Sequence, residues 1–421
     1  MSENLAIVIL AAGEGTRMKS ACSKVLHKVA GKPIIRYIAD LVMSLDSDCR
    51  KLVVVGHQAD DIKEYLGSDF SYVHQKELLG TGHAVMQAKP FLEDFSGEVM
   101  VLCGDAPLLN GESIARLLDV HRQENLDCTL LTGILKNPEG YGRIVRKSHG
   151  EISKIVEEKN ASLFEKANEE VNSGTYCFRW EFLNEVLETI EIRKDKGEYY
   201  LTDVVERMFR SGKRIGSVVL EDGDEVRGIN SKRDLANVGE VVFSRIKNAH
   251  MDAGVTIVDP RTTFIDHDVV IGQDTIIYPF TVIEGKVEIG RNCHVGPFSH
   301  LRNGTVLENG SEVGNFVEVK NTRIKKGSKA KHLTYLGDAC IGAKVNIGAG
   351  TITANYDGKN KHKTTIEDGA FIGSGTIMIA PVKIGQDAVT AAGAVITKHH
   401  DVPDGSLALG MPARIRKKEV K

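Results

Sequence analysis

The first half of the chain alternates short apolar runs with amphipathic segments. Three of the runs, residues 6–10, 51–55 and 98–102, are continuously apolar apart from Lys51 and Glu98, which begin the second and third of them. Strands that are apolar on both faces are typical of a parallel sheet covered by helices on each side. We therefore expect residues 1–230 to form an open, doubly wound α/β domain.

Residues 231–252 have a different pattern. Ser-Lys-Arg-Asp at 231–234 is followed by Leu235, Val238, Val242 and Ile246, which are three or four positions apart. This spacing, behind a capping sequence, predicts a helix. We interpret it as a linker between two domains.

Beyond Gly254 an aliphatic residue recurs at every sixth position. The period runs without interruption from Ile271 to Val319, returns at Ile341 and Ile347, and continues from Ile366 to Ile396 with Thr390 in one place. Neither a helix nor a flat strand produces a six-residue period. A triangular coil of about 18 residues does, because each of its three sides is a short strand with one inward aliphatic residue. The pattern predicts a parallel β-helix over residues 253–421.

One polar segment interrupts this period. Residues 353–365 read Thr-Ala-Asn-Tyr-Asp-Gly-Lys-Asn-Lys-His-Lys-Thr-Thr, which is longer than a corner of the coil and rich in Lys and Asn. Such a segment should project as a loop, and projecting loops often carry function.

Composition excludes several function classes. The chain has 54 Lys and Arg against 57 Asp and Glu, so it has no overall charge bias toward nucleic acid or membrane lipid. Its seven cysteines are scattered without a metal-like spacing, which is typical of reduced thiols in a cytoplasmic protein. The apolar run at 5–12 is too short to span a membrane and has no basic segment before it, so we read it as a buried strand.

The first predicted strand continues into a glycine-rich loop, Leu-Ala-Ala-Gly-Glu-Gly-Thr-Arg-Met at 10–18. Glycines after a parallel strand let backbone N–H groups converge on an anion at the carboxyl edge of the sheet. The spacing matches neither the dinucleotide-binding nor the P-loop motif, which disfavours both classes. Arg17 and Lys24 follow, and these two cations could meet a triphosphate.

Further motifs succeed the loop in a fixed order: Gln75, Leu-Gly-Thr-Gly at 79–82, Gly104-Asp105, Gly-Tyr-Gly-Arg at 140–143, Glu157, Val-Asn-Ser-Gly at 171–174, Glu-Tyr-Tyr-Leu-Thr-Asp at 198–203, and Gly-Ile-Asn at 228–230. Together with the glycine loop they resemble the sugar-1-phosphate nucleotidyltransferases, which have a Rossmann-like, GT-A-like fold. The closest resemblance is to the N-acetylglucosamine-1-phosphate uridylyltransferase half of the bifunctional GlmU family.

The resemblance implies a role for each matching position. The uracil and ribose would be held by Leu10, Gly13, Gln75, Gly80 and Thr81. The sugar would be held by Gly142, Glu157 and Asn172. Arg17 and Lys24 would be catalytic, and Asp105 and Asn230 would bind Mg²⁺, with Lys24 and Asn230 also contacting the substrates.

That chemistry suits the residue types. Mg²⁺ prefers oxygen ligands, and one carboxylate with one amide oxygen leaves room for phosphate oxygens and water. The metal and the two cations would neutralise the triphosphate and the departing pyrophosphate. Two positions depart from the family pattern: Cys103 stands where an aromatic residue is common, and Ser23 where proline is usual.

Two segments of the predicted β-helix, 314–320 and 329–338, are unusually rich in His, Lys, Glu and Tyr. Glu318 and Lys320 are two apart in a strand and so share a face. A solitary histidine on a β-helix is most often a surface residue, but His332 lies between Lys320 and Tyr335. This clustering favours a site.

The segment from about 312 to 393 resembles the glucosamine-1-phosphate acetyltransferase half of the same family. The resemblance implies that His332 is the general base that deprotonates the substrate amine, which suits an imidazole because its pKa lies near neutrality. The sugar phosphate would be bound by Arg302, Lys320, Tyr335 and Asn346. Acetyl-CoA would be bound by Ala349, Asn355, Tyr356, Ser374 and Ala392.

The family resemblance also implies a left-handed β-helix and a homotrimer. Two features depart from the pattern. The stretch between Asn230 and Arg302 is short, which implies fewer coils, and Gly410 replaces an arginine that helps to bind CoA.

Our leading hypothesis is a bifunctional cytoplasmic enzyme that makes UDP-N-acetylglucosamine from glucosamine 1-phosphate, acetyl-CoA and UTP through N-acetylglucosamine 1-phosphate, with no nucleic-acid or membrane partner. Two alternatives stay open. The β-helix could be an assembly or regulatory module on a monofunctional nucleotidyltransferase, or both halves could be catalytic with another base or sugar, as in thymidylyl transfer.

Overall fold

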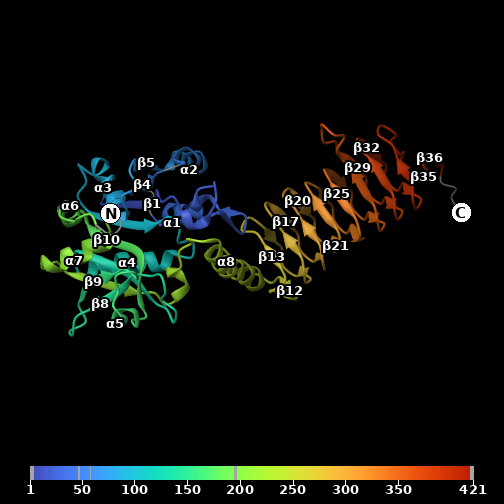
Figure 1. Cartoon of the computed structure of the whole chain (residues 1–421). Coiled ribbons are helices and arrows are strands. Elements are labelled where there is room, and N and C mark those ends of the chain that lie inside the picture. Colours follow the sequence, from blue (N-terminus) through green and yellow to red (C-terminus); the bar gives the residue numbers. More distant parts are fainter. Residues whose placement is uncertain (1–3, 46–47, 57, 194–196, 418–421) are drawn as a thin grey trace. The chain divides into compact units, whose positions relative to one another are not determined.

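The computed structural model describes residues 4–45, 48–56, 58–193 and 197–417 (Figure 1). The chain divides into two compact units, one ending at Val241 and the other beginning at Val242. This boundary falls inside a helix, α8 (Lys232–Asp252). Among the described helices, none is long and apolar enough to cross a membrane.

The first unit contains a mixed sheet of nine strands. Its main path follows the order β11 (Ile215–Val219), β7 (Cys128–Ile134), β10 (Glu170–Arg179), β6 (Glu98–Cys103), β1 (Leu5–Ala11), β4 (Arg50–Val55) and β5 (Ser71–His74). The three apolar runs are the adjacent parallel strands β6, β1 and β4, as the sequence predicts. β10 is antiparallel to β6 and β7, which the sequence pattern did not indicate.

Side chains of the central strand alternate between two apolar cores. In β1, Leu5, Ile7 and Ile9 belong to one core, and Ala6 and Val8 to the other. The first core also contains residues of α1 (Ile34–Leu45), α2 (Ala59–Leu66) and α4 (Gly111–Gln123). The second contains residues of α3 (Thr81–Met86), α6 (Trp180–Leu187) and α7 (Thr202–Arg210). Burial on both faces confirms the doubly wound α/β class.

Smaller elements complete this unit. β8 (Arg143–Arg146) pairs with β9 (Ile152–Val156) and with β10. β2 (Lys28–Val29) and β3 (Lys32–Pro33) form a short hairpin, and α5 (Leu163–Lys166) is a single capped turn.

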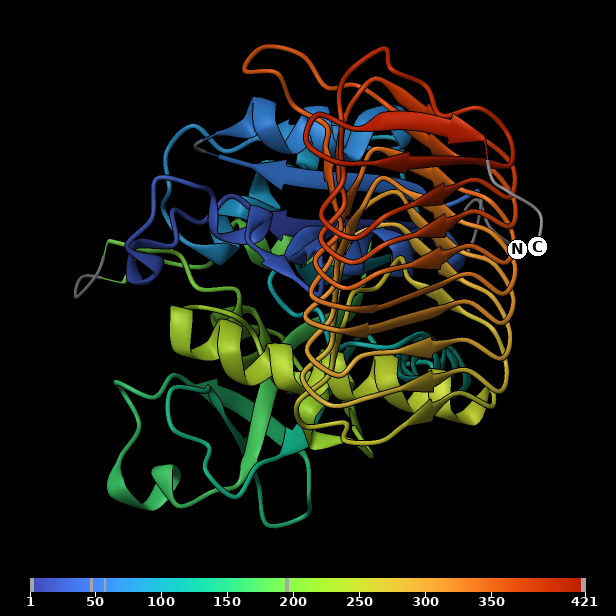
Figure 2. The same cartoon turned by 90° about the vertical axis from the view of Figure 1, so that its right-hand side faces the viewer.

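The second unit is a stack of parallel strands in three sheets (Figure 2). The first sheet contains β12 (Thr256–Ile257), β15 (Ile276–Ile277), β18 (His294–Val295), β21 (Glu312–Asn315), β24 (Lys329–His332), β27 (Asn346–Ile347), β30 (Phe371–Ile372), β33 (Val389–Thr390), β35 (Ser406–Leu409) and the antiparallel β36 (Arg414–Lys417). The second contains β13 (Phe264–Ile265), β16 (Val282–Ile283), β19 (His300–Leu301), β22 (Glu318–Lys320), β25 (Tyr335–Gly337), β28 (Ile352–Ala354), β31 (Ile377–Ile379) and β34 (Val395–Ile396). The third contains β14 (Val270–Ile271), β17 (Val287–Ile289), β20 (Thr305–Leu307), β23 (Arg323–Ile324), β26 (Ala339–Ile341), β29 (Thr364–Ile366) and β32 (Val382–Ile384).

The six-residue register is confirmed as the inward face of these strands. From Ile271 to Val319 every register position is buried and belongs to one continuous core. The sequence loses the register between Val319 and Ile341, but the coil does not. Ile324, Ala330 and Leu336 carry the core across this region, and two of the steps are five residues long instead of six. Shortened corners therefore hid a continuous stack.

Buried hydroxyl groups hold the corners of the coil. Thr281 donates to the carbonyl of Tyr278 at 2.8 Å, and Thr334 donates to the carbonyl of His332 at 2.7 Å. A buried carbonyl without a partner would be destabilising, so these side chains stabilise the turns. The hydroxyl of Thr334 thereby fixes the backbone at His332.

Candidate functional sites

Two adjoining cavities lie at the carboxyl ends of β1 and β6 in the first unit. Their volumes are about 680 Å³ and 410 Å³. Six residues line both of them: Leu10, Arg17, Thr81, Cys103, Asp105 and Glu157. The carboxyl edge of an open α/β sheet is the usual place for a ligand.

The larger cavity includes the glycine loop. It is lined by all five residues that the resemblance assigns to the uracil and ribose, namely Leu10, Gly13, Gln75, Gly80 and Thr81. Gly15 has a φ of +64°, and a Cβ there would lie 2.6 Å from Cβ of Lys24. Only glycine fits this turn, because it accepts the left-handed conformation and leaves room for the lysine.

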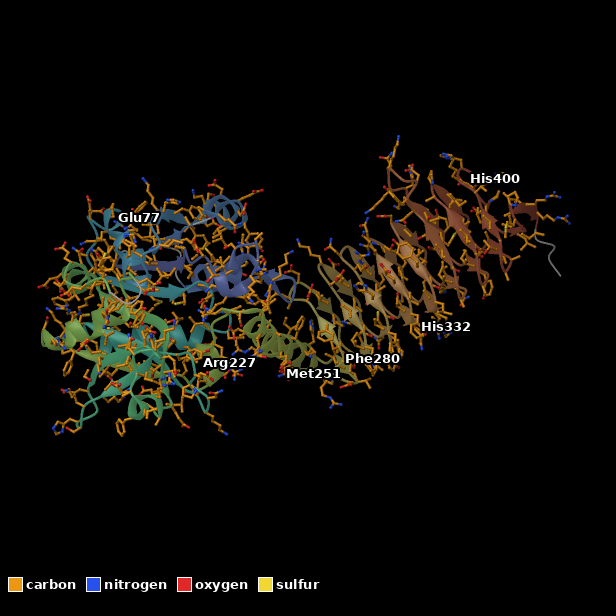
Figure 3. All side chains as sticks on the ribbon, viewed as in Figure 1. Glu77, Arg227, Met251, Phe280, His332 and His400 are labelled. Carbon is orange, nitrogen blue, oxygen red and sulfur yellow. The ribbon has the colours of Figure 1, made fainter. Side chains whose placement is uncertain are left out.

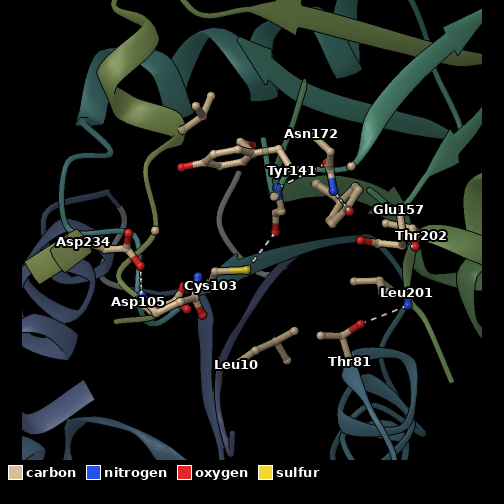
Figure 4. Close-up of a pocket in the computed structure, with 18 of the residues that line it drawn as sticks. Leu10, Thr81, Cys103, Asp105, Tyr141, Glu157, Asn172, Leu201, Thr202 and Asp234 are labelled. Carbon is tan, nitrogen blue, oxygen red and sulfur yellow. Dashed lines mark hydrogen bonds between the residues drawn. The ribbon is translucent and has the colours of Figure 1, made fainter. Parts of the chain in front are cut away.

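The smaller cavity is lined by the three residues assigned to the sugar, Gly142, Glu157 and Asn172 (Figure 4). The hydroxyl of Thr202 donates to Glu157 at 3.0 Å. The Asn172 amide donates to the hydroxyl of Tyr176 at 2.7 Å, and its oxygen accepts the Gly174 N–H at 3.2 Å. These contacts hold both polar side chains in place. The sequence analysis did not single out Thr202, although it lies in the 198–203 motif.

Lys24 contacts both expected metal ligands. Its ammonium group donates to the carboxylate of Asp105 and, at 3.1 Å, to Oδ1 of Asn230. Asp234 accepts the backbone N–H groups of Asn230 and Ser231 at 3.1 and 2.8 Å, which fixes the loop that carries Asn230. Asp234 is therefore a positioning residue for Asn230. The sequence indicated it only as part of the capping sequence at 231–234 and not in this role.

Few of the described side chains near Asp105 and Asn230 could act as metal ligands. The described residues contain no cluster of three or more His, Cys, Asp and Glu that could hold a metal ion. One carboxylate and one amide oxygen suit a hard cation that takes its remaining ligands from phosphate and water. Arg17 is exposed and lines both cavities.

Cys103 lies at the junction of the two cavities. Its thiol donates to the carbonyl of Gly174 at 3.4 Å. A Cβ on Gly174 would lie 2.7 Å from Sγ, so the two residues are in close contact. Burial raises the pKa of Cys103 to about 12. The thiol is therefore neutral.

In the second unit, the residues expected to bind sugar phosphate lie on consecutive coils. Arg302 follows β19, Lys320 ends β22 and Tyr335 begins β25, and these three strands are neighbours in one sheet. Arg302 forms ion pairs with Glu318 at 2.8 Å and Glu284 at 3.3 Å.

His332 and Asn346 belong to the adjacent sheet. His332 is exposed at the end of β24, where Asn315 of the preceding coil lies opposite it, and Asn346 begins β27. The hydroxyl of Tyr335 lies over Gly337, where a Cβ would come within 2.5 Å of the hydroxyl oxygen. Glycine at 337 is therefore required for this placement of the Tyr335 ring.

Lys361 is a further candidate that the sequence analysis did not single out. It belongs to the loop at 355–363, which forms a bridge between Tyr356 and Lys361. The pKa of Lys320 is lowered because the ammonium group of Lys361 lies beside it and disfavours its positive charge. Two ammonium groups this close form an anion-binding arrangement. The Lys-rich composition of the loop was the available signal.

Three residues expected to bind acetyl-CoA form one column along a corner of the stack. The carbonyl of Ala349 accepts the N–H of Gly375 at 2.7 Å, and the carbonyl of Ser374 accepts the N–H of Gly393 at 2.8 Å. Ala392 precedes Gly393 and occupies the same place one coil on. The column therefore carries only small side chains.

The same corner is bulky on the other side of His332. Phe280 stacks on Phe298 with ring centroids 4.8 Å apart, and Phe298 on Phe316 at 5.2 Å. Leu333 continues this row, and Figure 3 labels Phe280 and His332 on the same edge of the stack. In the next coil, Asn346 lies opposite Lys329. Leu333 and Gly350 each come four residues later, so Gly350 occupies the place of Leu333 in that coil. The corner thus changes from large to small residues next to His332.

The remaining two residues assigned to acetyl-CoA have different surroundings. Asn355 is 7% exposed, and its amide donates to the carboxylate of Asp338, which also accepts from Asn321 at 2.6 Å. Tyr356 is 61% exposed, and its hydroxyl donates to the carbonyl of Gly358 at 2.6 Å. The structure thus places Asn355 inside a polar cluster and Tyr356 on the open loop.

Comparison with known proteins agrees with this architecture. A family model described as nucleotidyl transferase matches residues 6–228. A model described as bacterial transferase hexapeptide (six repeats) matches residues 268–303, 286–321 and 363–398. The chain is therefore a nucleotidyltransferase joined to a hexapeptide-repeat β-helix.

Relatives match the chain over nearly its whole length. A bifunctional protein GlmU of Geobacillus sp. (strain WCH70) is 45% identical, covering 97% of this chain and 96% of that protein. Those of Acetivibrio thermocellus and Bacillus subtilis (strain 168) are 42% and 41% identical, each over 97% of this chain and 95% or 96% of theirs. The chain belongs to the bifunctional GlmU family.

Proposed function

We propose that the chain catalyses two consecutive reactions in the synthesis of UDP-N-acetylglucosamine. The β-helix acetylates glucosamine 1-phosphate with acetyl-CoA. The N-terminal unit then transfers UMP from UTP to the resulting N-acetylglucosamine 1-phosphate and releases pyrophosphate. The observation that carries the proposal is that the expected residues of the first site line two adjoining cavities.

The first site supports an in-line displacement. A phosphate oxygen of N-acetylglucosamine 1-phosphate attacks the α-phosphorus of UTP, one O–P bond forms, and the bond to pyrophosphate breaks. Glu157 and Asn172 hold the sugar so that its phosphate points toward the nucleotide cavity. Arg17 and Lys24 neutralise charge on the triphosphate and the leaving group, so catalysis is mainly positioning and electrostatics.

We infer that Asp105 and Asn230 bind Mg²⁺ at this site. Their oxygen donors fit a hard divalent cation, which would supply Lewis-acid stabilisation of the phosphate oxygens. Lys24 now donates to both residues. Lys24 would have to release these two oxygens for Asp105 and Asn230 to hold a cation.

The second site supports direct acetyl transfer. The amine of glucosamine 1-phosphate attacks the thioester carbonyl, a C–N bond forms, the C–S bond breaks, and CoA leaves as its thiol. His332 takes the proton that the amine loses and returns it to the departing thiolate. Lys320, Lys361 and Arg302 supply positive charge for the sugar phosphate. The small column of Ala349, Ser374 and Ala392 leaves room for the CoA chain beside His332.

We further propose that the protein is a cytoplasmic homotrimer assembled through the β-helix. Phe280, Phe298 and Phe316 are 52%, 46% and 57% exposed, and a continuous exposed aromatic row is typical of an interaction surface. All seven cysteines lie within the described residues, and none of them forms a disulfide. Light scattering should give a mass about three times that of the chain.

Two variants test whether each of the two reactions is catalysed by its own site. Asp105→Asn removes the charge at constant shape and should lower pyrophosphate release from UTP and N-acetylglucosamine 1-phosphate at least about 100-fold. His332→Ala should lower thiol release from acetyl-CoA and glucosamine 1-phosphate by about 100- to 10,000-fold. Each variant should keep the other activity.

Matched controls are available in both units. Asp119→Asn alters an exposed carboxylate on α4, and His400→Ala an exposed histidine of the β-helix, and neither should change either rate. If wild-type protein released no thiol, the β-helix would be an assembly module on a monofunctional transferase. A preference for dTTP over UTP would instead indicate thymidylyl transfer.

A further inference from the structure

His83 belongs to α3 and lies next to Gln75, one of the residues of the larger cavity assigned to the uracil and ribose. It contacts the amide of Gln75, which is 4% exposed and lines that cavity. We propose that His83 is a positioning residue that, together with the carbonyl of Gly80, holds the Gln75 amide in one orientation and thereby makes the site select uracil over cytosine. This inference rests on the proposed uridylyl transfer and concerns how that site reads the base.

The orientation of the Gln75 amide follows from its other neighbour. Nε2 of Gln75 lies 3.1 Å from the carbonyl oxygen of Gly80. A backbone carbonyl can only accept a hydrogen bond, so the end of the amide that faces it must be the NH₂ group. Rotating the amide by 180° would place two oxygens against each other.

The second hydrogen of this NH₂ group requires another acceptor. Nε2 of Gln75 lies 3.0 Å from Nδ1 of His83. Nδ1 must therefore carry a lone pair, which puts the ring proton on Nε2. Nε2 of His83 lies 3.0 Å from Nε2 of Gln87. Since both nitrogens would then donate, the Gln87 amide takes the orientation rotated by 180°, in which its oxygen accepts from the ring. One tautomer of His83 satisfies the whole chain of contacts.

The backbone of α3 keeps this ring in place. Gly80 has a φ of +94°, and a Cβ there would lie 2.6 Å from the carbonyl oxygen of Tyr199. The Gly82 N–H donates to the same carbonyl at 2.8 Å, and the Leu201 N–H donates to the hydroxyl of Thr81 at 3.1 Å. The His83 ring is stacked beside Tyr199. The contacts between residues 80–83 and residues 199–201 thus fix the position of Nδ1 of His83.

The consequence is that Gln75 offers a ligand only its oxygen. Uracil has an N–H at ring position 3, which can donate to that oxygen. Cytosine has a lone pair at this position, which would face the oxygen and repel it. A buried polar group left without its partner costs far more than a lost contact at the surface, so this mismatch discriminates strongly. Thymine has the same N–H as uracil and is not discriminated.

Three substitutions separate the roles of the ring atoms. His83→Asn places an amide oxygen where Nδ1 lies and keeps the acceptor. His83→Gln places its oxygen nearer the position of Nε2, and His83→Leu removes both polar atoms. Inhibition constants of CTP and dTTP against UTP should be measured in the pyrophosphate-release assay, because competition reports binding even when a nucleotide is a poor substrate.

We expect His83→Leu and His83→Gln to lower the preference for UTP over CTP about tenfold, and the UTP to dTTP ratio to stay within about twofold. His83→Asn should keep both ratios. The proposal is overturned if His83→Leu and His83→Gln retain the wild-type ratio for CTP, or if His83→Asn loses it equally. Absence of pyrophosphate release from the wild-type protein would instead refute the proposed function itself.

Discussion

The two units of the chain assemble their candidate sites in different ways. In the N-terminal unit, Gly13, Gln75, Asp105, Glu157 and Asn230 come from loops after different elements, and crossovers through the sheet bring them to one edge. In the β-helix, neighbours across coils are about one turn apart in sequence. Asn315 lies opposite His332, and Glu318 lies opposite Tyr335.

This difference changes what a substitution can disturb. A sheet covered on both faces shares two continuous cores among its strands and the six helices α1, α2, α3, α4, α6 and α7. A coil of the β-helix contacts mainly the coils before and after it, so its stability is close to a sum over neighbours. The N-terminal site therefore depends on the whole unit, and the β-helix site depends on a few adjacent coils.

The largest expected effect is on the stability of each unit alone. Leu336→Ala removes a fully buried side chain from the β-helix core and should destabilise that unit by about 2–5 kcal/mol. The one tryptophan of the chain, Trp180, lies in the N-terminal unit. Urea unfolding should shift the transition seen by circular dichroism and leave the Trp180 fluorescence transition unchanged.

Leu131→Ala is the matched variant, since Leu131 is equally buried in β7 of the N-terminal unit. It should shift the Trp180 transition instead. If either substitution moved both transitions together, the two units would unfold as one and the comparison would fail.

A smaller effect concerns acid stability of the N-terminal unit. His121 is buried on α4, and burial lowers its pKa to about 4. Its Nδ1 lies 2.8 Å from the hydroxyl of Thr129. The charged and titratable groups that act on it are Glu98, Arg122, Asp127 and Arg179.

Because the folded-state pKa lies below the unfolded value of about 6.5, the unfolded chain binds more protons between these two values. The stabilising contribution is present above about pH 6.5 and is lost as the pH falls toward 4. The loss should reach about 3 kcal/mol at pH 4. Trp180 fluorescence in urea at several pH values measures it, and His121→Asn should flatten the dependence. An unchanged slope in the variant would contradict the assignment to His121.

The smallest expected effect is on substrate binding in the β-helix. Lys361→Met removes one of the two ammonium groups at Lys320 and should raise KM for glucosamine 1-phosphate about five- to tenfold, with a smaller change in kcat. Lys359→Met alters a neighbouring exposed lysine of the same loop and serves as the control. A change in kcat alone would argue against a phosphate-binding role.

Much of the fold could be predicted because it follows from local periodicity. Continuous apolar runs predicted the parallel strands β1, β4 and β6, and a six-residue period predicted the β-helix. The antiparallel β10 could not be predicted, since strand direction is set by which neighbour it meets. The coil from Val319 to Ile341 was missed because two corners are shorter by one residue, which changes the sequence spacing but not the inward direction of each side chain.

The candidate sites also contain residues that the sequence predicted and residues that it did not. Motifs predicted which residues gather at the sheet edge and along the β-helix, because loops after parallel strands share an edge and equivalent coil positions share a face. They did not predict Asp234 behind Asn230, Lys361 beside Lys320, or His83 behind Gln75. Lys361 lies beside Lys320 because the coil brings together two segments that are distant in the sequence. Asp234 and His83 are only four and eight residues from their partners, but their hydrogen bonds depend on the conformation of the backbone in between, which only the folded structure sets. The glycine loop and the six-residue period could be recognised from the sequence itself, because both follow from backbone geometry over a few residues.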